Sequence, residues 1–141
     1  MNALQLDTVR MSADRTHLEI LDQTLLPGTV KVLQVSKIED IWEAIKLLRV
    51  RGAPAIGVCA GYAIALTASG IDTADPQKFC EKFMEQKEYL ASSRPTAVNL
   101  FWALNRMERV MRANLDKDVA QIKEILFTEA QAIRDEDVAI S

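Results

Sequence analysis

The first 35 residues contain short apolar stretches separated by turn residues. The apolar stretches lie at 9–11, 18–21 and 30–35, and the last of them mixes valines with polar residues, which is typical of a half-buried strand. Pro27-Gly28 marks a turn before it. Residues 1–35 are therefore predicted to form three short strands in a small antiparallel sheet.

The apolar spacing becomes helical at Ser36. Ser36 and Glu39 have the spacing of a capping box, in which each side chain bonds the backbone of the other. Apolar residues then recur every three or four positions: Ile38, Ile41, Trp42, Ile45 and Leu48. Because Gly52 and Pro54 follow, this first helix is predicted to end near Val50.

Four more helices are predicted from start and stop signals. They cover 54–69, a segment from 75 in which Asp75 caps and Pro76 starts the helix, about 95–114, and a segment that begins after Asp116 or Asp118. The last helix carries an amphipathic stripe at helical spacing: Val119, Ile122, Leu126, Ala130 and Ile133.

This order of elements predicts an α+β fold, with a small antiparallel β-sheet (1–35) followed by a bundle of about five α-helices (36–141). Trp42, Phe101 and Trp102 are expected in its core. The final helix has no stop signal before Ser141, which favours a chain that continues into a further domain, although a natural terminus there stays open.

The stretch from Gly52 to Ile71 contains no charged residue and is long enough to cross a bilayer. Small residues dominate it, Pro54 lies near its start, and Thr67 and Ser69 lie near its end. These features lower its hydrophobicity, so a buried central helix is favoured over a membrane span.

Composition narrows the function. The chain has 141 residues, 49% hydrophobic and 26% charged, with a net charge of −3 and its Lys and Arg dispersed among acidic residues. A nucleic-acid binder would need a basic patch, so none is expected as a partner. Cys59 and Cys80 are too few for a disulfide framework, and His17 has no ligand partners at metal spacing, so free thiols, no metal and a cytoplasmic location are expected.

Two arginines stand beside proline-marked helix starts. Arg51 precedes Gly52-Ala53-Pro54, and Arg94 precedes Pro95. A cation at a helix start is repelled by the positive end of the helix dipole. A bound anion would offset this repulsion by accepting hydrogen bonds from the guanidinium and from free backbone N–H groups. The planar fork of arginine suits phosphate, and Gly52 would let a ligand approach the backbone.

Each arginine taken alone also fits an ordinary surface or ion-pair residue, and the pattern leaves open whether the two helix starts converge. Other chemistry is not indicated. The sequence has no Gly-x-Gly-x-x-Gly loop, no Walker loop, and no Ser/His/Asp or Cys/His arrangement of familiar spacing.

Three motifs resemble those of the methylthioribose-1-phosphate isomerases, a family that includes the alpha, beta and delta subunits of translation initiation factor 2B. They are Arg51-Gly-Ala-Pro-Ala-Ile-Gly57, Ser93-Arg-Pro-Thr-Ala-Val-Asn-Leu100 and Asp22-Gln-Thr-Leu-Leu-Pro27. The acidic run Asp135-Glu-Asp137 also resembles part of the family's linking helix. The resemblance covers essentially the whole chain.

The resemblance implies an aldose–ketose isomerase that converts 5-methylthioribose 1-phosphate to 5-methylthioribulose 1-phosphate in methionine salvage, without metal or organic cofactor. Arg51, Gly52, Ala53 and Arg94 match the family's substrate-binding positions. The family's catalytic Cys and Asp belong to a Rossmann-like carboxy-terminal domain that is absent here, so this amino-terminal portion is expected to be inactive alone and dimeric when full length.

Two alternatives stay open. A factor-2B-like regulatory subunit shares the family motifs, although a regulatory homologue need not keep both arginines with their Gly-Ala-Pro and Pro-Thr neighbours. A helical protein-interaction module is the other reading if Ser141 is the true terminus.

Overall fold

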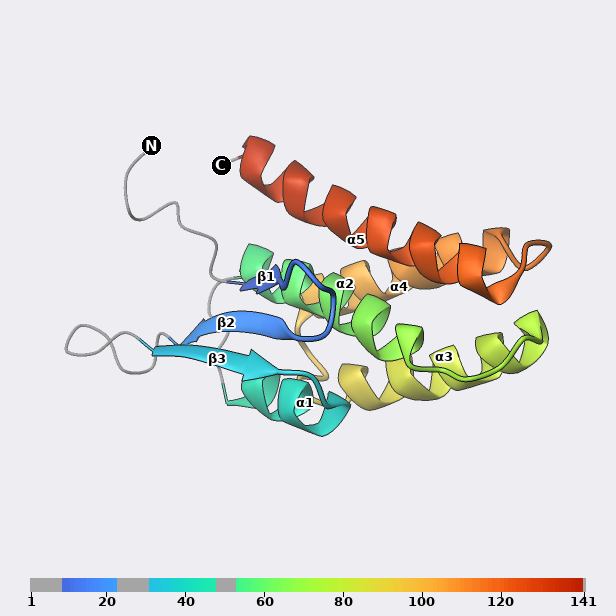
Figure 1. Cartoon of the computed structure of the whole chain (residues 1–141). Coiled ribbons are helices and arrows are strands. Elements are labelled where there is room, and N and C mark those ends of the chain that lie inside the picture. The colour runs from blue at the N-terminus through green and yellow to red at the C-terminus, as the bar shows by residue number, and fades with distance from the viewer. Residues whose placement is uncertain (1–8, 23–30, 48–52, 141) are drawn as a thin grey trace.

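The computed structural model describes the backbone of residues 9–22, 31–47 and 53–140 and the side chains of residues 9–20, 32–47 and 55–136. Within these residues the chain forms three strands and then five helices, which confirms the α+β fold (Figure 1). They are β1 (Val9–Met11), β2 (Leu18–Asp22), β3 (Lys31–Val35), α1 (Ile38–Lys46), α2 (Ala53–Ser69), α3 (Pro76–Ala91), α4 (Val98–Ala113) and α5 (Val119–Ile140).

The sheet is antiparallel in the order β1-β2-β3. Val9 pairs with Ile20, and both side chains are buried on the face that meets the helices. Arg10 and Glu19 pair on the opposite face and form an ion pair. The alternation of apolar and charged residues thus fixes which face of the sheet packs on the bundle.

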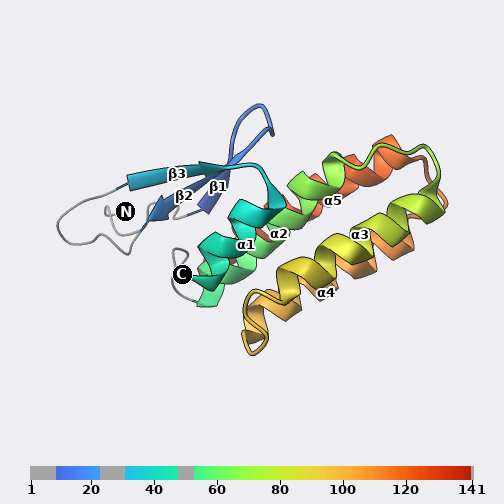
Figure 2. The same ribbon diagram turned by 90° about the horizontal axis from the view of Figure 1, so that it is seen from below.

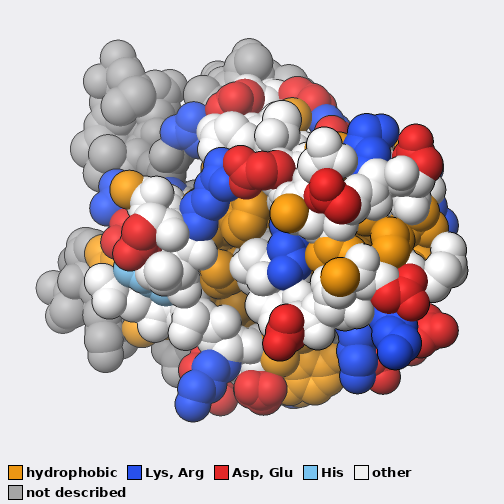
Figure 3. Space-filling model, turned by 45° about the vertical axis from the view of Figure 1, so that its right-hand side comes forward, with side chains coloured by type: hydrophobic (Ala, Val, Ile, Leu, Met, Phe, Trp, Pro, Cys, Tyr) orange, Lys and Arg blue, Asp and Glu red, His pale blue; other side chains and the backbone are white. Residues whose placement is uncertain are grey.

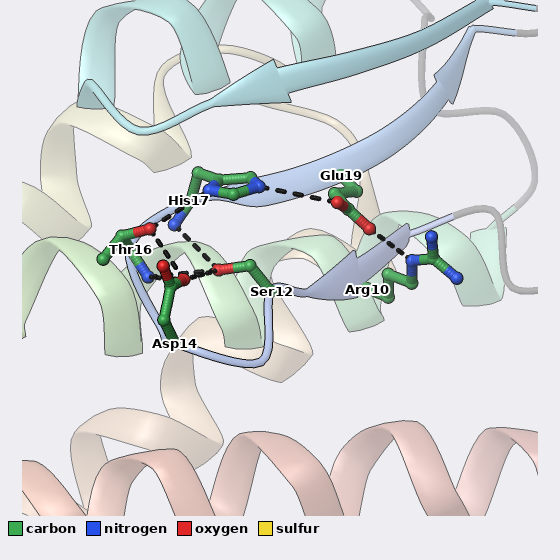
Figure 4. A network of polar contacts seen from close by, with 6 residues as sticks. All are labelled: Arg10, Ser12, Asp14, Thr16, His17 and Glu19. Atoms are coloured by element: carbon green, nitrogen blue, oxygen red, sulfur yellow. Dashed lines mark hydrogen bonds and ion pairs between the residues drawn. The ribbon is translucent and has the colours of Figure 1, made fainter.

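A dense set of hydrogen bonds closes the turn between β1 and β2 (Figure 4). The Ser12 hydroxyl donates to the Asp14 carboxylate and accepts from the backbone N–H groups of Thr16 and His17. Asp14 also accepts from the Thr16 hydroxyl at 2.7 Å. These bonds hold Arg15 at a φ of 59°, a left-handed conformation that non-glycine residues rarely adopt.

Arg15 joins this turn to α5. Its guanidinium pairs with Glu124 and lies 4.6 Å from the centre of the Phe127 ring. The sheet is therefore attached to the bundle at its turn as well as through its buried face.

Helices α2 to α5 alternate in direction, so α2 and α4 run one way and α3 and α5 run the other (Figures 1 and 2). The central helix is α2, which packs against α3, α4 and α5 and is apolar all round. Its glycines allow close approach, since a Cβ on Gly61 would lie 3.1 Å from Cδ1 of Ile133 in α5. The uncharged stretch is thus a buried helix, as the sequence predicts, and no described helix combines the length and apolar character that a bilayer crossing needs.

The predicted cap of α3 is confirmed, and of the two starts predicted for α5 the structure shows the one after Asp118. Asp75 accepts a hydrogen bond from the backbone N–H of Gln77, and Asp118 accepts one from that of Gln121. The apolar stripe predicted for α5 is buried along its whole length.

The prediction for α1 was wrong at both ends. Its cap residue is Lys37, with no side-chain cap hydrogen bond, so Ser36 and Glu39 form no capping box. The helix ends at Lys46 instead of near Val50, because the backbone N–H of Leu47 already closes the last turn. Leu48, the last member of the predicted stripe, lies outside the described residues.

The fourth helix also starts later than predicted. α4 begins at Val98, and the backbone N–H of Ala97 bonds the Arg94 carbonyl at 3.0 Å. Proline fits the second position of such a turn as well as it fits a first helical turn, and here Pro95 takes the turn position.

The core aromatics were wrongly predicted. Trp102 is 47% exposed, and Trp42 and Phe101 are half-buried. The buried aromatic residues among those described are Tyr62, Phe79, Phe83 and Phe127, and the rings of Phe79 and Phe83 meet at 6.4 Å between centroids. In α4 the buried face is formed instead by aliphatic and Met side chains: Leu100, Ala103, Leu104, Met107 and Met111. Trp102 lies on the opposite face, where Arg106 covers its ring at 5.5 Å.

Candidate functional site

The four residues predicted to bind substrate differ in how they can be placed. Arg51 and Gly52 lie outside the described residues. Ala53 is the first residue of α2, and only its backbone is described. Arg94 lies in the connection between α3 and α4, three residues before the cap of α4. The arginine pair therefore stays a prediction, and the structure describes the helix starts that would carry it.

The starts of α2 and α4 lie side by side. Because the four helices alternate in direction, both starts lie at the same end of the bundle (Figures 1 and 2). Gly57, one turn into α2, faces Asn99, the second residue of α4. A Cβ on Gly57 would lie 3.5 Å from the Asn99 carbonyl oxygen. The sequence left this convergence open, because it depends on how the helices pack.

The start of α4 has backbone donors to offer. Its cap, Ala97, makes no side-chain cap hydrogen bond, and its first turn contains no acidic residue. By contrast, Asp75 and Asp118 cap α3 and α5 at the other end of the bundle. The first N–H groups of a helix have no partner within it and carry the positive end of its dipole. The start of α4 therefore favours an anion.

Arg94 is half-buried, and its guanidinium forms no ion pair with any residue that the structure describes. Arg106, in the same helix bundle, is by contrast paired with carboxylates. It donates to Glu129 at 2.6 Å and to both carboxylate oxygens of Glu136 at 2.8 and 2.6 Å. Within the described part of the chain, the charge of Arg106 is thus neutralised by carboxylates, whereas that of Arg94 is not.

The connection that carries Arg94 is held in place on both sides. Before it, the buried Ser93 hydroxyl donates to the Leu90 carbonyl at 2.6 Å. After it, the turn bond from Ala97 to Arg94 leads into α4. Neither hydrogen bond could be predicted from the charges or the motifs, although the Ser-Ser-Arg-Pro sequence is typical of a chain reversal.

The cysteines do not form a second candidate site. Burial raises the pKa of the Cys59 thiol to about 12, because the thiolate would lose its solvation inside α2. Cys80 lies 3.7 Å from the Arg112 guanidinium and is 7% exposed. Among the described residues, no three of His, Cys, Asp and Glu gather closely enough to hold a metal ion.

Two open hollows lie away from the helix starts, where α2 ends. One, of about 530 Å³, is lined by α3 and by the segment that follows α2, and the other, of about 430 Å³, lies below the β1–β2 turn. Both are lined by Gly70 and Gln86. Acidic and basic side chains alternate on the face shown in Figure 3, and the linings themselves mix hydroxyl, amide and charged groups. This mixture selects no ligand class, so the hollows do not replace the helix starts as the candidate site.

The family assignment follows from residues 49–141, which match the profile of the Initiation factor 2 subunit family. The chain belongs to this family. The match includes the start of α2, the α3–α4 connection and both arginines.

Several known family members are similar to the chain. It is 58% identical over 120 residues to the methylthioribose-1-phosphate isomerase of Parabacteroides distasonis, covering 85% of this chain and 36% of that protein. Some further relatives are named 5-deoxyribose 1-phosphate isomerase.

The crystal structure of 5-methylthioribose 1-phosphate isomerase from Pyrococcus horikoshii OT3 superposes with a TM-score of 0.88 at 38% identity, over 96% of this chain and 39% of that one. The delta subunit of translation initiation factor eIF-2B from A. fulgidus gives a TM-score of 0.81 at 37% identity, over 94% and 38%. The chain thus spans little more than a third of the length of these relatives.

Proposed function

We propose that the adjacent starts of α2 and α4 bind the phosphate of a sugar 1-phosphate, and that the chain is the substrate-binding part of an aldose–ketose isomerase. The reaction proposed is conversion of 5-methylthioribose 1-phosphate to 5-methylthioribulose 1-phosphate, in the cytoplasm. One observation carries the proposal: two helix starts meet at Gly57 and Asn99, one of them has no side-chain cap, and it is preceded by Arg94, which forms no ion pair with a described residue.

The chemistry of the reaction explains why such a site would be needed. A phosphate ester on the anomeric carbon keeps the sugar ring closed, so the enzyme itself must assist ring opening. Guanidinium groups and oriented N–H donors would hold the phosphate and balance the negative charge that develops on oxygen. Arg94 and Arg51 would supply the guanidinium groups, and the backbone at Gly52 and Ala53 would allow close approach of the phosphate.

The residues that transfer protons are proposed to lie outside this chain. The described cysteines are buried and held within the helical core. A carboxy-terminal domain of the kind expected for the family would supply the acid and base, and homodimerisation would belong to the full-length protein. On this proposal residues 1–141 alone bind the substrate without turning it over.

The test is an isomerase assay on the complete gene product, with 5-methylthioribose 1-phosphate and 5-deoxyribose 1-phosphate as the two substrates. Phosphorus NMR monitors the conversion of each. We expect conversion of a sugar 1-phosphate, and we expect Arg51→Ala and Arg94→Ala to lose most of it while keeping the helical circular-dichroism spectrum. Wild-type kinetics in both variants would refute the phosphate role. The two substrates are included because relatives carry both names.

A regulatory-subunit function is the second candidate, and the superposition on the factor 2B delta subunit favours it. A protein of that kind would turn over neither sugar phosphate and would copurify with other subunits. The isomerase is preferred because Arg51, Arg94 and their Gly-Ala-Pro and Pro-Thr neighbours are all present.

A further inference from the structure

One side-chain hydrogen bond joins α1 to the connection that carries Arg94. The indole Nε1–H of Trp42 donates to the Ser92 hydroxyl oxygen at 2.9 Å. That hydroxyl in turn donates to the carbonyl oxygen of Tyr89 at 2.6 Å. Ser92 is the cap residue at the end of α3, two residues before Arg94. The chain of bonds therefore fixes the point at which α3 ends.

The indole is also held in orientation. The Trp42 ring stacks on the Tyr89 ring, with centroids 5.9 Å apart and planes at 29°. The Lys46 ammonium lies 5.4 Å from the centre of the Trp42 ring on α1. Because Tyr89 and Lys46 both contact the ring, the indole N–H of Trp42 points in one direction.

This cluster lies at the surface and outside the core. Tyr89 is 40% exposed, Ser92 is exposed and Trp42 is half-buried. An exposed neutral hydrogen bond contributes little to global stability, because water replaces it on unfolding. The hydrogen bond between Trp42 and Ser92 therefore affects the position of the α3–α4 connection more than it affects the stability of the fold.

Trp42 also precedes the other predicted arginine. α1 ends at Lys46, and Arg51 follows five residues later along the chain. Trp42 is thus bonded across space to the Arg94 segment and linked through the backbone to the Arg51 segment.

We propose that Trp42 is a positioning residue of the phosphate site, which acts through Ser92 to set the place of the α3–α4 connection and of the Arg94 guanidinium. The proposal rests on the proposed function. Without the indole donor, the end of α3 and the residues after it sample more conformations, and binding must then order them. Affinity for phosphate falls while the fold persists.

The test measures the dissociation constant of inorganic phosphate by calorimetry on the complete gene product, together with thermal melting. Trp42→Phe keeps the stacked ring and removes the donor, and Ser92→Ala removes the acceptor. Each is expected to weaken phosphate binding about 2- to 10-fold, the range for one neutral hydrogen bond. Ser92→Thr keeps the hydroxyl and should restore wild-type affinity, and melting temperatures should change by no more than about 2 °C.

Arg94→Ala separates the two proposals. If Arg94→Ala leaves phosphate binding unchanged, the proposed function is wrong whatever Trp42 does. If Arg94→Ala weakens binding while Trp42→Phe and Ser92→Ala do not, only the positioning role is wrong. The positioning role would also be overturned if Trp42→Phe and Ser92→Ala lowered the melting temperature without weakening phosphate binding, or if Ser92→Thr failed to restore the affinity.

Fluorescence gives a readout that a purely structural contact would not move. Residues 1–141 contain two Trp residues, so Trp102→Phe, together with replacement by Phe of any Trp elsewhere in the complete gene product, leaves Trp42 as the sole Trp emitter. Phosphate titration should change Trp42 emission in that background, and adding Ser92→Ala should abolish most of the change. An emission change that persists unaltered without the Ser92 hydroxyl contradicts the proposal.

Discussion

Gly57 of α2 and Asn99 of α4 face each other so closely that a Cβ on the glycine would lie 3.5 Å from the asparagine carbonyl oxygen and 3.8 Å from its Cβ. A methyl group at position 57 would therefore lie in ordinary van der Waals contact with α4, and we expect the additional atoms of a longer side chain to push the two helices apart. The small size of the residue at position 57 therefore suits two parallel helices that begin next to each other.

We expect Gly57→Ala to be tolerated and Gly57→Leu to separate the helix starts. Alanine should leave phosphate affinity intact and raise stability by up to about 1 kcal/mol, since glycine disfavours a helix interior. Leucine should cost about 1–3 kcal/mol through overpacking and should weaken phosphate binding as well. Urea denaturation and phosphate calorimetry on both variants make the comparison, and a leucine variant with normal stability and affinity would contradict the described packing.

Glu108 of α4 provides a prediction about pH. Hydrogen bonds from Lys87, and then from Arg112 at 2.7 Å, hold the pKa of the Glu108 carboxyl below its usual value. A carboxyl whose pKa is depressed in the folded state adds stability above its unfolded-state pKa. That stability is lost as the pH falls through the folded-state value.

Glu108→Gln should therefore destabilise the protein by about 1–2 kcal/mol near neutral pH, between the values for exposed and buried ion pairs. The penalty should shrink as the pH falls below the ordinary glutamate pKa of about 4.3 and through the lower pKa that Glu108 has in the folded state. Glu85→Gln is the control, because Glu85 and Lys82 form an ion pair at 3.8 Å with side chains 70% and 66% exposed. Urea denaturation across pH checks both, and equal penalties for the two variants would contradict the prediction.

Cys59 should resist alkylation in the folded protein. Burial excludes reagent, and a thiol pKa of about 12 leaves almost no thiolate at about pH 8. Cys80, which keeps 7% exposure, should react first. Peptide mass spectrometry after timed iodoacetamide treatment distinguishes the two sites, and Cys59 should react only as fast as the chain unfolds. Equal rates for both cysteines would show that α2 is not the buried centre of the bundle.

Local signals in the sequence located much of this fold, because their causes are local. An Asp before a helix is bonded by the helix's own N–H groups, so Asp75 marked the start of α3, and Asp116 or Asp118 marked that of α5, without knowledge of their neighbours. The apolar stripe of α5 likewise marked its buried face.

Features that depend on packing could not be located in the same way. α4 carries large apolar residues on two faces, and only contact with α2, α3 and α5 decides that Met107 is buried and Trp102 exposed. Pro95 suits both a turn and a helix start, so α4 was predicted three residues too early. The motifs predicted which residues would bind phosphate, but the meeting of the helix starts at Gly57 and Asn99 requires the tertiary fold.

The central claim is that a phosphate binds where α2 and α4 begin, and phosphate calorimetry on Arg94→Ala tests it most directly. Arg109→Ala is the matched control, since Arg109 is an exposed arginine further along α4 that forms no ion pair with a described residue. Arg94→Ala should weaken binding of inorganic phosphate to the complete gene product about 10- to 100-fold, as expected for one charged hydrogen-bond donor. Arg109→Ala should leave binding unchanged, and equal effects of the two substitutions would contradict the account.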